Sequence, residues 1–312
     1  MSTIDQLGLI SETAPGYSVH PFAANDRLQV ITLSEQALQA FVADTRRWDM
    51  QALEYKPFLR FVVADRLNRV CGGTLGELLN TIVHNRDQGA VLLQCEGQTQ
   101  DDRTELYVML STAVSHLIGI PNLDSMYGKY YARFTVRNTD NSDSYLRQGH
   151  RRMELHNDGT YVDEHTDFVL MMKLVEENVV GGESLLLHLD DWQDLDKFYD
   201  HPLAKQEIVW GSPPSKQVDY KVKHPVFDED PNGNPHMLYI DQFAEPQNMS
   251  EGLYLFELSE SLESDDNCFG VPVPVGSMLI VQNHCWLHGR DKFEPHPDLE
   301  RELLRQRGHF TT

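Results

Sequence analysis

The chain has 312 residues, of which 40% are hydrophobic and 24% charged, so it can bury one large core or two modest ones. Its formal net charge of −22 would repel a phosphate backbone, which excludes nucleic acid as an expected partner. No apolar run reaches the roughly 18 to 20 residues that cross a membrane, and the N-terminus lacks the basic-then-apolar pattern of a signal peptide. Its four cysteines are scattered and include no C-x-x-C pair. We therefore expect a soluble, cytoplasmic protein with no membrane partner.

The first part of the chain has a helical pattern. Residues 34–83 carry apolar side chains three and four positions apart, with Ser34 as a plausible N-cap. A short strand at about 90–94 and a further helix at about 102–117 follow. We expect residues 1–25 to be a poorly ordered or loosely attached N-terminus and about 34–120 to form a helical flank.

After Pro121 the pattern changes to short β-type runs separated by Gly, Pro, Asn and Asp. Helices near 192–205 and 252–264 interrupt these runs, which are YYARFTVRN, DFVLMMKLV, ESLLLHL, HMLYIDQF, SMLIVQN and ELLRQRGHF. No internal repeat or linker marks a domain boundary. The pattern favours a mainly β protein with a helical flank, a double-stranded β-helix (jelly-roll) formed as a single domain by residues 26–312.

A metal site is indicated by ELHNDGTYVDEH, in which His156 and Asp158 stand two residues apart. In an extended strand these two side chains share a face. His288, 130 residues after Asp158 and directly after an apolar run, would complete a triad of two histidines and one carboxylate. Such a triad occupies one side of an octahedral ion and leaves the other open, as in non-haem iron(II) oxygenases. Both histidines are expected at strand ends.

Three other histidines compete for this role. His150, His165 and His284 lie near the proposed ligands in the sequence. His284 and His288 could share one helical face and bind zinc, but the preceding apolar run indicates a strand and no Glu lies between them. We therefore interpret His284 as structural, or as a residue that supports the metal ligands.

Arginines follow the third ligand. An iron site that activates dioxygen needs an electron donor such as a 2-oxo acid, whose distant carboxylate requires a cation. In LERELLRQRGHF, alternation places Arg305, Arg307 and His309 on one face. We assign Arg307 to that carboxylate, with Arg305 as its close competitor and Arg301 third. No side chain is needed as a general base.

These segments resemble a known family. The triad spacing, GGESLLLHL, VPVPVGSMLIVQNHCWLHGRDKF and the trailing arginines are similar to the clavaminate synthase-like and taurine dioxygenase-like branch of the iron(II)/2-oxoglutarate oxygenases. The segments ALEYKPFLRF, YYARFTVRNTDNSDSYLRQGHRRMELHNDGTYV, VLMMKL, SLLLHLDDW, HPVFD, YIDQF and HPDLERELLRQRG resemble, within that branch, the bacterial glutarate 2-hydroxylases, or carbon-starvation-induced proteins. The likeness extends from about residue 50 to residue 310.

The resemblance implies a function. Family members hydroxylate glutarate at C2 to L-2-hydroxyglutarate, with Fe(2+) as cofactor and with 2-oxoglutarate and O2 converted into succinate and CO2. It further implies a jelly-roll homotetramer that acts in lysine breakdown, with iron ligands falling on His156, Asp158 and His288. Arg133 and Arg152 are candidates for the substrate carboxylates, although either could be in a structural ion pair.

Other functions remain open at this stage. The same oxygenase chemistry could act on another small carboxylate. A zinc hydrolase would use similar ligands but lacks an obvious Glu base beside them. A non-catalytic acid-binding barrel would bind its ligand without turnover.

Overall fold

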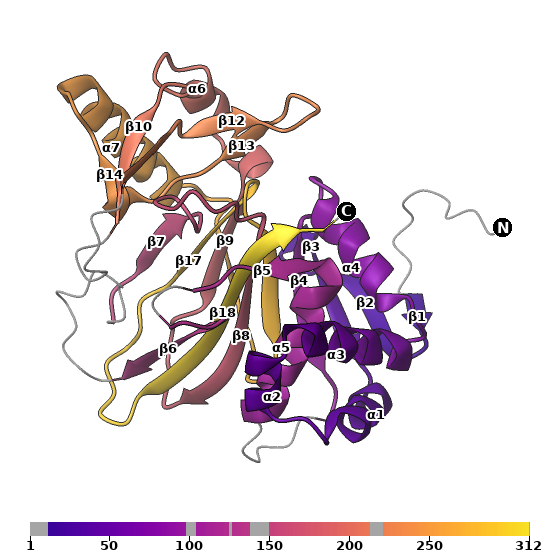
Figure 1. Cartoon of the computed structure of the whole chain (residues 1–312). Coiled ribbons are helices and arrows are strands. Elements are labelled where there is room, and N and C mark those ends of the chain that lie inside the picture. The colour runs from indigo at the N-terminus through magenta and orange to yellow at the C-terminus, as the bar shows by residue number, and fades with distance from the viewer. Residues whose placement is uncertain (1–11, 98–103, 125–126, 138–149, 213–220, 312) are drawn as a thin grey trace. The chain divides into compact units, whose positions relative to one another are not determined.

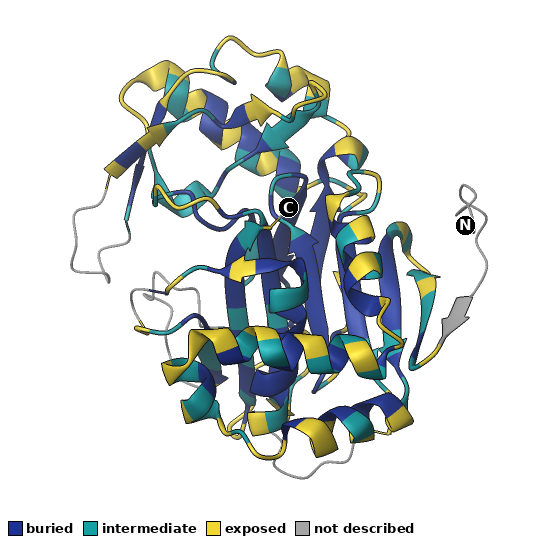
Figure 2. Cartoon of the chain, turned by 45° about the vertical axis from the view of Figure 1, so that its right-hand side comes forward, coloured by how far each residue is buried: buried dark blue, intermediate teal, exposed yellow. Residues whose placement is uncertain are grey.

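The computed structural model (Figure 1) describes residues 12–97, 104–124, 127–137, 150–212 and 221–311. Contacts between residues divide the chain into two compact units, Met1–Ile118 and Gly119–Thr312. Strands in both units are mostly buried, whereas the helices alternate buried and exposed residues along their length (Figure 2). In the part of the chain that is described, no helix is long and apolar enough to span a bilayer.

The N-terminal unit combines a sheet with helices. Its sheet has the order β1-β2-β3-β4, antiparallel except for the parallel pair β3 and β4. Helix α4 packs on β4 and α5, and α3 packs on α1, α2 and α5. The elements are β1 (Glu12–Ala14), β2 (Tyr17–Phe22), β3 (Asn25–Leu33), α1 (Glu35–Thr45), α2 (Met50–Tyr55), α3 (Pro57–Val70), α4 (Leu75–His84), β4 (Ala90–Cys95) and α5 (Thr104–Ile118).

Several predictions for this unit are confirmed. Ser34 caps α1, since its hydroxyl accepts a hydrogen bond from the amide of Ala37 at 3.2 Å. The expected strand and the helix after it correspond to β4 and α5. Strand β3 was not predicted from the sequence, and its residues from Leu28 to Ile31 are all buried. Of residues 1–25, the first eleven lie outside the described residues, and the rest include β1 and β2.

Besides the small sheets β11-β10-β14 and β12-β13, the C-terminal unit contains two larger sets of antiparallel strands. In the first, β16, β8 and β18 pair in that order, and both β5 and β6 pair with the far edge of β18. The second has the order β15-β9-β17-β7. The first sheet comprises β5 (Gly119–Pro121), β6 (Ala132–Arg137), β8 (Phe168–Glu177), β16 (Met278–Gln282) and β18 (Glu300–Phe310), and the second β7 (Met153–His156), β9 (Ser184–His188), β15 (Phe269–Val271) and β17 (Trp286–Arg290).

Between β9 and β15 the chain forms an insertion with its own apolar core. That core includes Trp192, Phe198 and Trp210, and it also buries Leu187 of β9 and Leu287 of β17. The insertion consists of a 3-10 turn (Leu189–Asp191), α6 (Leu195–Tyr199), β10 (Ile208–Gly211), β11 (Lys221–His224), β12 (Phe227–Glu229), β13 (Pro235–Met237), a second 3-10 turn (Asp241–Phe243), β14 (Ala244–Glu245) and α7 (Met249–Glu263). Because strand residues alternate, residues next to these leucines face the opposite side of the sheet.

Three local predictions for this unit need correction. The helix expected near 192–205 is shorter, α6 alone, preceded by a 3-10 turn. The run HMLYIDQF is a strand only at β13, because the backbone of Tyr239 bonds to Asn157 instead of to a neighbouring strand. His288 is the middle residue of β17 and not at a strand end. The sheet-rich prediction itself is confirmed.

Candidate metal centre

Strand pairing brings the two proposed histidine ligands together. His156 ends β7, His288 lies in β17, and the two residues are direct cross-strand partners. Directly opposed residues of an antiparallel pair point to the same face. Their ring centroids are 4.4 Å apart, and both residues are buried. Leu287 faces the insertion core, so alternation turns His288 to the other side of the sheet.

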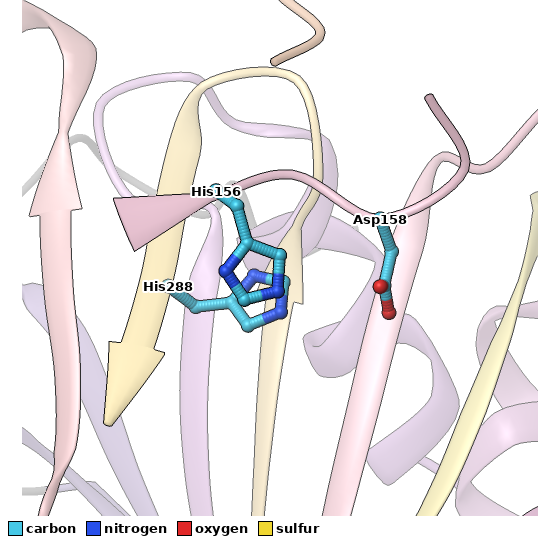
Figure 3. A group of neighbouring side chains, drawn as sticks. All are labelled: His156, Asp158 and His288. Atoms are coloured by element: carbon cyan, nitrogen blue, oxygen red, sulfur yellow. The ribbon is translucent and has the colours of Figure 1, made fainter. Parts of the chain in front are cut away.

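The carboxylate of Asp158 joins them. Figure 3 shows it on the same side of the segment from His156 to Asp158 as the two imidazoles. One ligand atom from each of the three residues lies within 4.8 Å of the others. Gly159 follows with a φ of +90°, and a Cβ there would lie 2.8 Å from the Thr166 hydroxyl. This glycine permits the turn after the ligand.

Two buried asparagines fix the position of Asp158. The side-chain amide of Asn283 accepts a hydrogen bond from the Asp158 amide and donates one to its carbonyl, both at 2.9 Å. The Asn157 side chain donates to the carbonyls of Asn283 and Trp286 at 2.6 and 3.1 Å and accepts from the amide of Tyr239. The sequence analysis missed both residues, although Asn157 lies between two ligands and Asn283 directly follows the apolar strand β16.

Substitution of Asn283 by Ala should destabilise the protein. The Asn283 side chain makes three buried hydrogen bonds, two to Asp158 and one to the carbonyl of Thr166. Their loss leaves buried backbone groups unpaired, so we expect the free energy of unfolding to fall by about 3 kcal/mol. Denaturant unfolding measures this change. Asn267→Ala removes an exposed amide that bonds to Asp191 and should cost under about 1 kcal/mol; equal losses would contradict the assigned role.

The electrostatics keep Asp158 and His288 in their metal-binding forms. Burial raises the pKa of Asp158, but the surrounding charges, that of Arg305 first among them, together outweigh burial, so this pKa lies below its ordinary value and the carboxylate stays ionised. Burial, and then the charge of His156, lowers the pKa of His288 to about 3, so this imidazole is neutral. Nδ1 of His156 lies 2.8 Å from the carbonyl of Glu154, an arrangement that orients ligating histidines.

Two orphaned atoms fit a bound cation. Oδ2 of Asp158 and Nδ1 of His288 are buried without a hydrogen-bond partner among the described residues. Unpaired buried polar atoms are costly, and an ion would satisfy the anionic one. The group offers three protein ligands, two nitrogen and one oxygen, which suit an octahedral iron(II) ion with open positions.

Arg305 forms an ion pair with the metal ligand Asp158. One guanidinium nitrogen lies 3.1 Å from Oδ1 of Asp158 and another 3.5 Å from Oδ2 of Asp124. The guanidinium also lies 4.7 Å from the ring centroid of Phe134. Two carboxylates therefore already neutralise this cation, and Asp124 was missed in the sequence because it belongs to a distant segment.

Arg307 differs from Arg305 in its partners. Strand β18 is regular from Leu303 to Gly308, so alternation puts Arg305 and Arg307 on one face. Arg307 is buried, and its Nε has no hydrogen-bond partner in the described part of the chain. Its charge also helps to lower the pKa of Asp158. A buried guanidinium with spare donors beside the ligands can bind a carboxylate.

Arg301 lies elsewhere on the same strand. Six residues of strand separate it from Arg307, a distance of about 20 Å. It is buried, and its guanidinium lies 5.5 Å from the ring centroid of Phe293. Burial lowers the pKa of Arg301 to about 10, against the opposing charge of Glu176.

The two arginines suggested for the substrate are in ion pairs. Arg133 donates two hydrogen bonds to Glu302, both at 2.7 Å. Arg152 donates to Glu263 of α7 at 2.7 Å, and the other oxygen of Glu263 accepts from the amide of Leu155 at 2.6 Å. The second pair thus ties α7 to the strand that carries His156. The structure does not bring Arg133 or Arg152 together with the metal ligands.

The competing histidines are not part of the triad. His165 and His284 belong to a separate group with Asp167. His150 lies before β7, and its Nδ1 is buried without a hydrogen-bond partner among the described residues. A cavity of about 210 Å³ is lined by Asp158 as well as by His165 and His284.

Comparisons with known proteins agree with this geometry. Residues 17–310 match the CsiD family. Proteins named glutarate 2-hydroxylase from Salmonella paratyphi B and Klebsiella pneumoniae are each 53% identical over 301 residues, which cover 96% of this chain and 93% of theirs.

Solved structures are similar in fold at lower identity. Asparagine oxygenase in complex with Fe(II), 2S,3S-3-hydroxyasparagine and succinate has a TM-score of 0.72 at 19% identity, covering 89% of this chain and 93% of that one. The non-heme iron oxygenase OrfP in complex with Fe and alpha-ketoglutaric acid has a TM-score of 0.66 at 16% identity, with the same coverage. With a family match over nearly its whole length and relatives at 53% identity, the chain belongs to the CsiD family.

Proposed function

We propose that the protein is an iron(II)- and 2-oxoglutarate-dependent dioxygenase that hydroxylates glutarate at C2 to L-2-hydroxyglutarate. The observation that carries this proposal is the buried group of His156, Asp158 and His288 in a chain 53% identical to proteins named glutarate 2-hydroxylase. One oxygen atom of O2 enters the new hydroxyl group and the other the new carboxylate of succinate, while 2-oxoglutarate loses CO2.

Each residue has a distinct task in this proposal. His156, Asp158 and His288 would hold iron(II), which, when bound, supplies the activation of dioxygen with electrons from the 2-oxo acid. Arg305 keeps Asp158 ionised and oriented through its 3.1 Å contact. Arg307 binds the distant carboxylate of 2-oxoglutarate with donors that the protein leaves unpaired.

No side chain has to move a proton during turnover. The chain's contribution is to hold both dicarboxylates in reach of the metal and to keep the site dry. Arg133 and Arg152 are engaged by Glu302 and Glu263, so we propose them as structural residues, not substrate ligands.

The wider architecture is part of the same proposal. Two antiparallel sheets, joined at the contact between Arg305 of β18 and Asp158 after β7, support a jelly-roll core. We propose residues 26–312 as one dioxygenase domain with a helical flank at about 34–120, to which β2 is joined by its pairing with β3, and β1 by its pairing with β2. From the family resemblance we also propose a cytoplasmic homotetramer acting in lysine breakdown, and sedimentation tests the oligomeric state.

Turnover with defined substrates tests the function. The protein is loaded anaerobically with iron(II) and 2-oxoglutarate, exposed to air with glutarate, adipate or pimelate, and analysed by mass spectrometry. We expect one succinate per 2-hydroxyglutarate, with glutarate as the preferred substrate. Product formed only from another dicarboxylate would show that glutarate is not the substrate, while the reaction class would stand. Hydrolytic activity with zinc, together with no oxygen uptake with iron, would contradict the reaction class.

A further inference from the structure

A second group of potential metal ligands lies outside the triad. Among the described residues, two groups of at least three His, Cys, Asp or Glu side chains bring ligand atoms within 4.8 Å of one another. The first is the triad, and the second consists of His165, Asp167 and His284. The two groups share no residue, and the proposed function uses none of the second group.

Its geometry matches the spacing of ligands around a tetrahedral ion. Nε2 of His165 and Nε2 of His284 each lie 3.3 Å from the same oxygen, Oδ1 of Asp167. Ligand atoms about 2.0 Å from a tetrahedral zinc ion are about 3.3 Å from each other. Charge-assisted hydrogen bonds are shorter, about 2.7 to 2.9 Å. The separations therefore fit ligands that share a cation, while at 3.3 Å Nε2 of His284 and Oδ1 of Asp167 are also within hydrogen-bonding distance of each other.

The surrounding structure holds the carboxylate in place. Oδ2 of Asp167 accepts a hydrogen bond from the amide of Phe310 at 2.9 Å, which leaves Oδ1 toward the two imidazoles. The Asp167 amide donates to the carbonyl of Gly308, and its carbonyl accepts from the amide of Asn283, both at 2.8 Å. A site with a fixed anionic ligand loses less entropy when it binds an ion.

The two histidines of the second group differ in their exposure to solvent. The side chain of His284 is 12% exposed, and its ring stacks on His236 with centroids 5.1 Å apart. The side chain of His165 is 74% exposed and can rotate to admit an ion from solvent. Both histidines line the cavity of about 210 Å³ that Asp158 also lines. An ion held by the second group would therefore lie at the wall of that cavity.

We propose that His165, Asp167 and His284 form a second metal site that binds a first-row divalent ion, with zinc as the test ion. Two imidazoles and one carboxylate are the donor set of many zinc sites with an open fourth position, which water or a ligand carboxylate would occupy. The same donors bind Ni²⁺ and Cu²⁺, following the usual affinity order.

Zinc stoichiometry tests the proposal. Metal-free full-length protein is dialysed against Zn²⁺, and bound zinc is measured by atomic spectroscopy. We expect two equivalents for the unaltered protein, one for Asp158→Ala, one for His165→Ala and none for the variant that carries both changes. His20→Ala, an exposed histidine of β2, should still bind two.

Asp167→Asn keeps the shape of the side chain and removes its charge, so it should also bind one equivalent. Circular dichroism confirms that each variant is folded. Two equivalents bound by both His165→Ala and Asp167→Asn would overturn the proposal, as would a single equivalent in the unaltered protein that Asp158→Ala abolishes. The latter result would identify the second group as a hydrogen-bonded structural cluster. If the triad does not bind a metal ion, the Asp158→Ala variant will instead bind as much zinc as the unaltered protein.

Discussion

Asp158→Ala should abolish succinate formation. The change removes the only carboxylate of the triad, and with it the negative charge that would hold an iron(II) ion beside the two imidazoles. We expect kcat to fall at least about a thousandfold, equivalent to ~4 kcal/mol of transition-state stabilisation. Succinate release, measured with a fixed excess of iron(II) and 2-oxoglutarate, gives the comparison with the unaltered protein.

Loss of activity must be separated from loss of fold. Asp158→Asn keeps the volume of the side chain and should be as inactive as the alanine variant, while thermal unfolding reports its stability. His296→Ala, an exposed histidine outside the triad, should turn over normally. Full activity of the Asp158 variants with iron would reject the triad.

Arg307→Lys should raise the KM for 2-oxoglutarate about 10- to 100-fold, with a smaller change in kcat. Lysine keeps the positive charge but replaces the planar fork that pairs with both carboxylate oxygens. The expected loss, about 1.4 to 2.7 kcal/mol, falls on binding of the co-substrate because, in the described part of the chain, Arg307 makes no hydrogen bond or ion pair with a metal ligand. Initial rates at varied 2-oxoglutarate concentration measure both constants.

Arg301→Lys is the matched comparison. Arg301 is on the same strand as Arg307, is equally buried and also has an Nε without a hydrogen-bond partner among the described residues. Its distance of about 20 Å from Arg307 should leave the KM for 2-oxoglutarate unchanged. A raised KM in Arg301→Lys with an unchanged value in Arg307→Lys would transfer the role to Arg301.

The sequence predicted the group of metal ligands in part because the pattern within one segment indicates which side chains lie on the same face. The rule that residues two positions apart on a strand share a face placed His156 and Asp158 together from a single segment. In the structure β7 ends at His156, and hydrogen bonds to Asn283 hold Asp158 beyond it. His288 followed from an apolar strand and the family resemblance. The register that opposes His288 to His156 depends on the pairing of β7 with β17, which no local pattern encodes.

The environment of the arginines could not be predicted in the same way. Arg133 pairs with Glu302, 169 residues away, and Arg152 with Glu263, 111 residues away. Among dozens of acidic residues, the sequence does not indicate which one will lie beside a given arginine. Strand β3 was also missed, and its burial on both faces, which includes the polar Gln29, is known only from the structure.

The pairing of His156 with His288 also sets the time at which the protein can acquire its metal. During synthesis, β7 leaves the ribosome 132 residues before its partner residue does, and a growing chain holds an incomplete ligand set until residue 288 has emerged. Arg305, which orients Asp158, arrives later still. Metal loading therefore follows translation of this region, and the ion then stabilises only molecules whose distant strands have already paired.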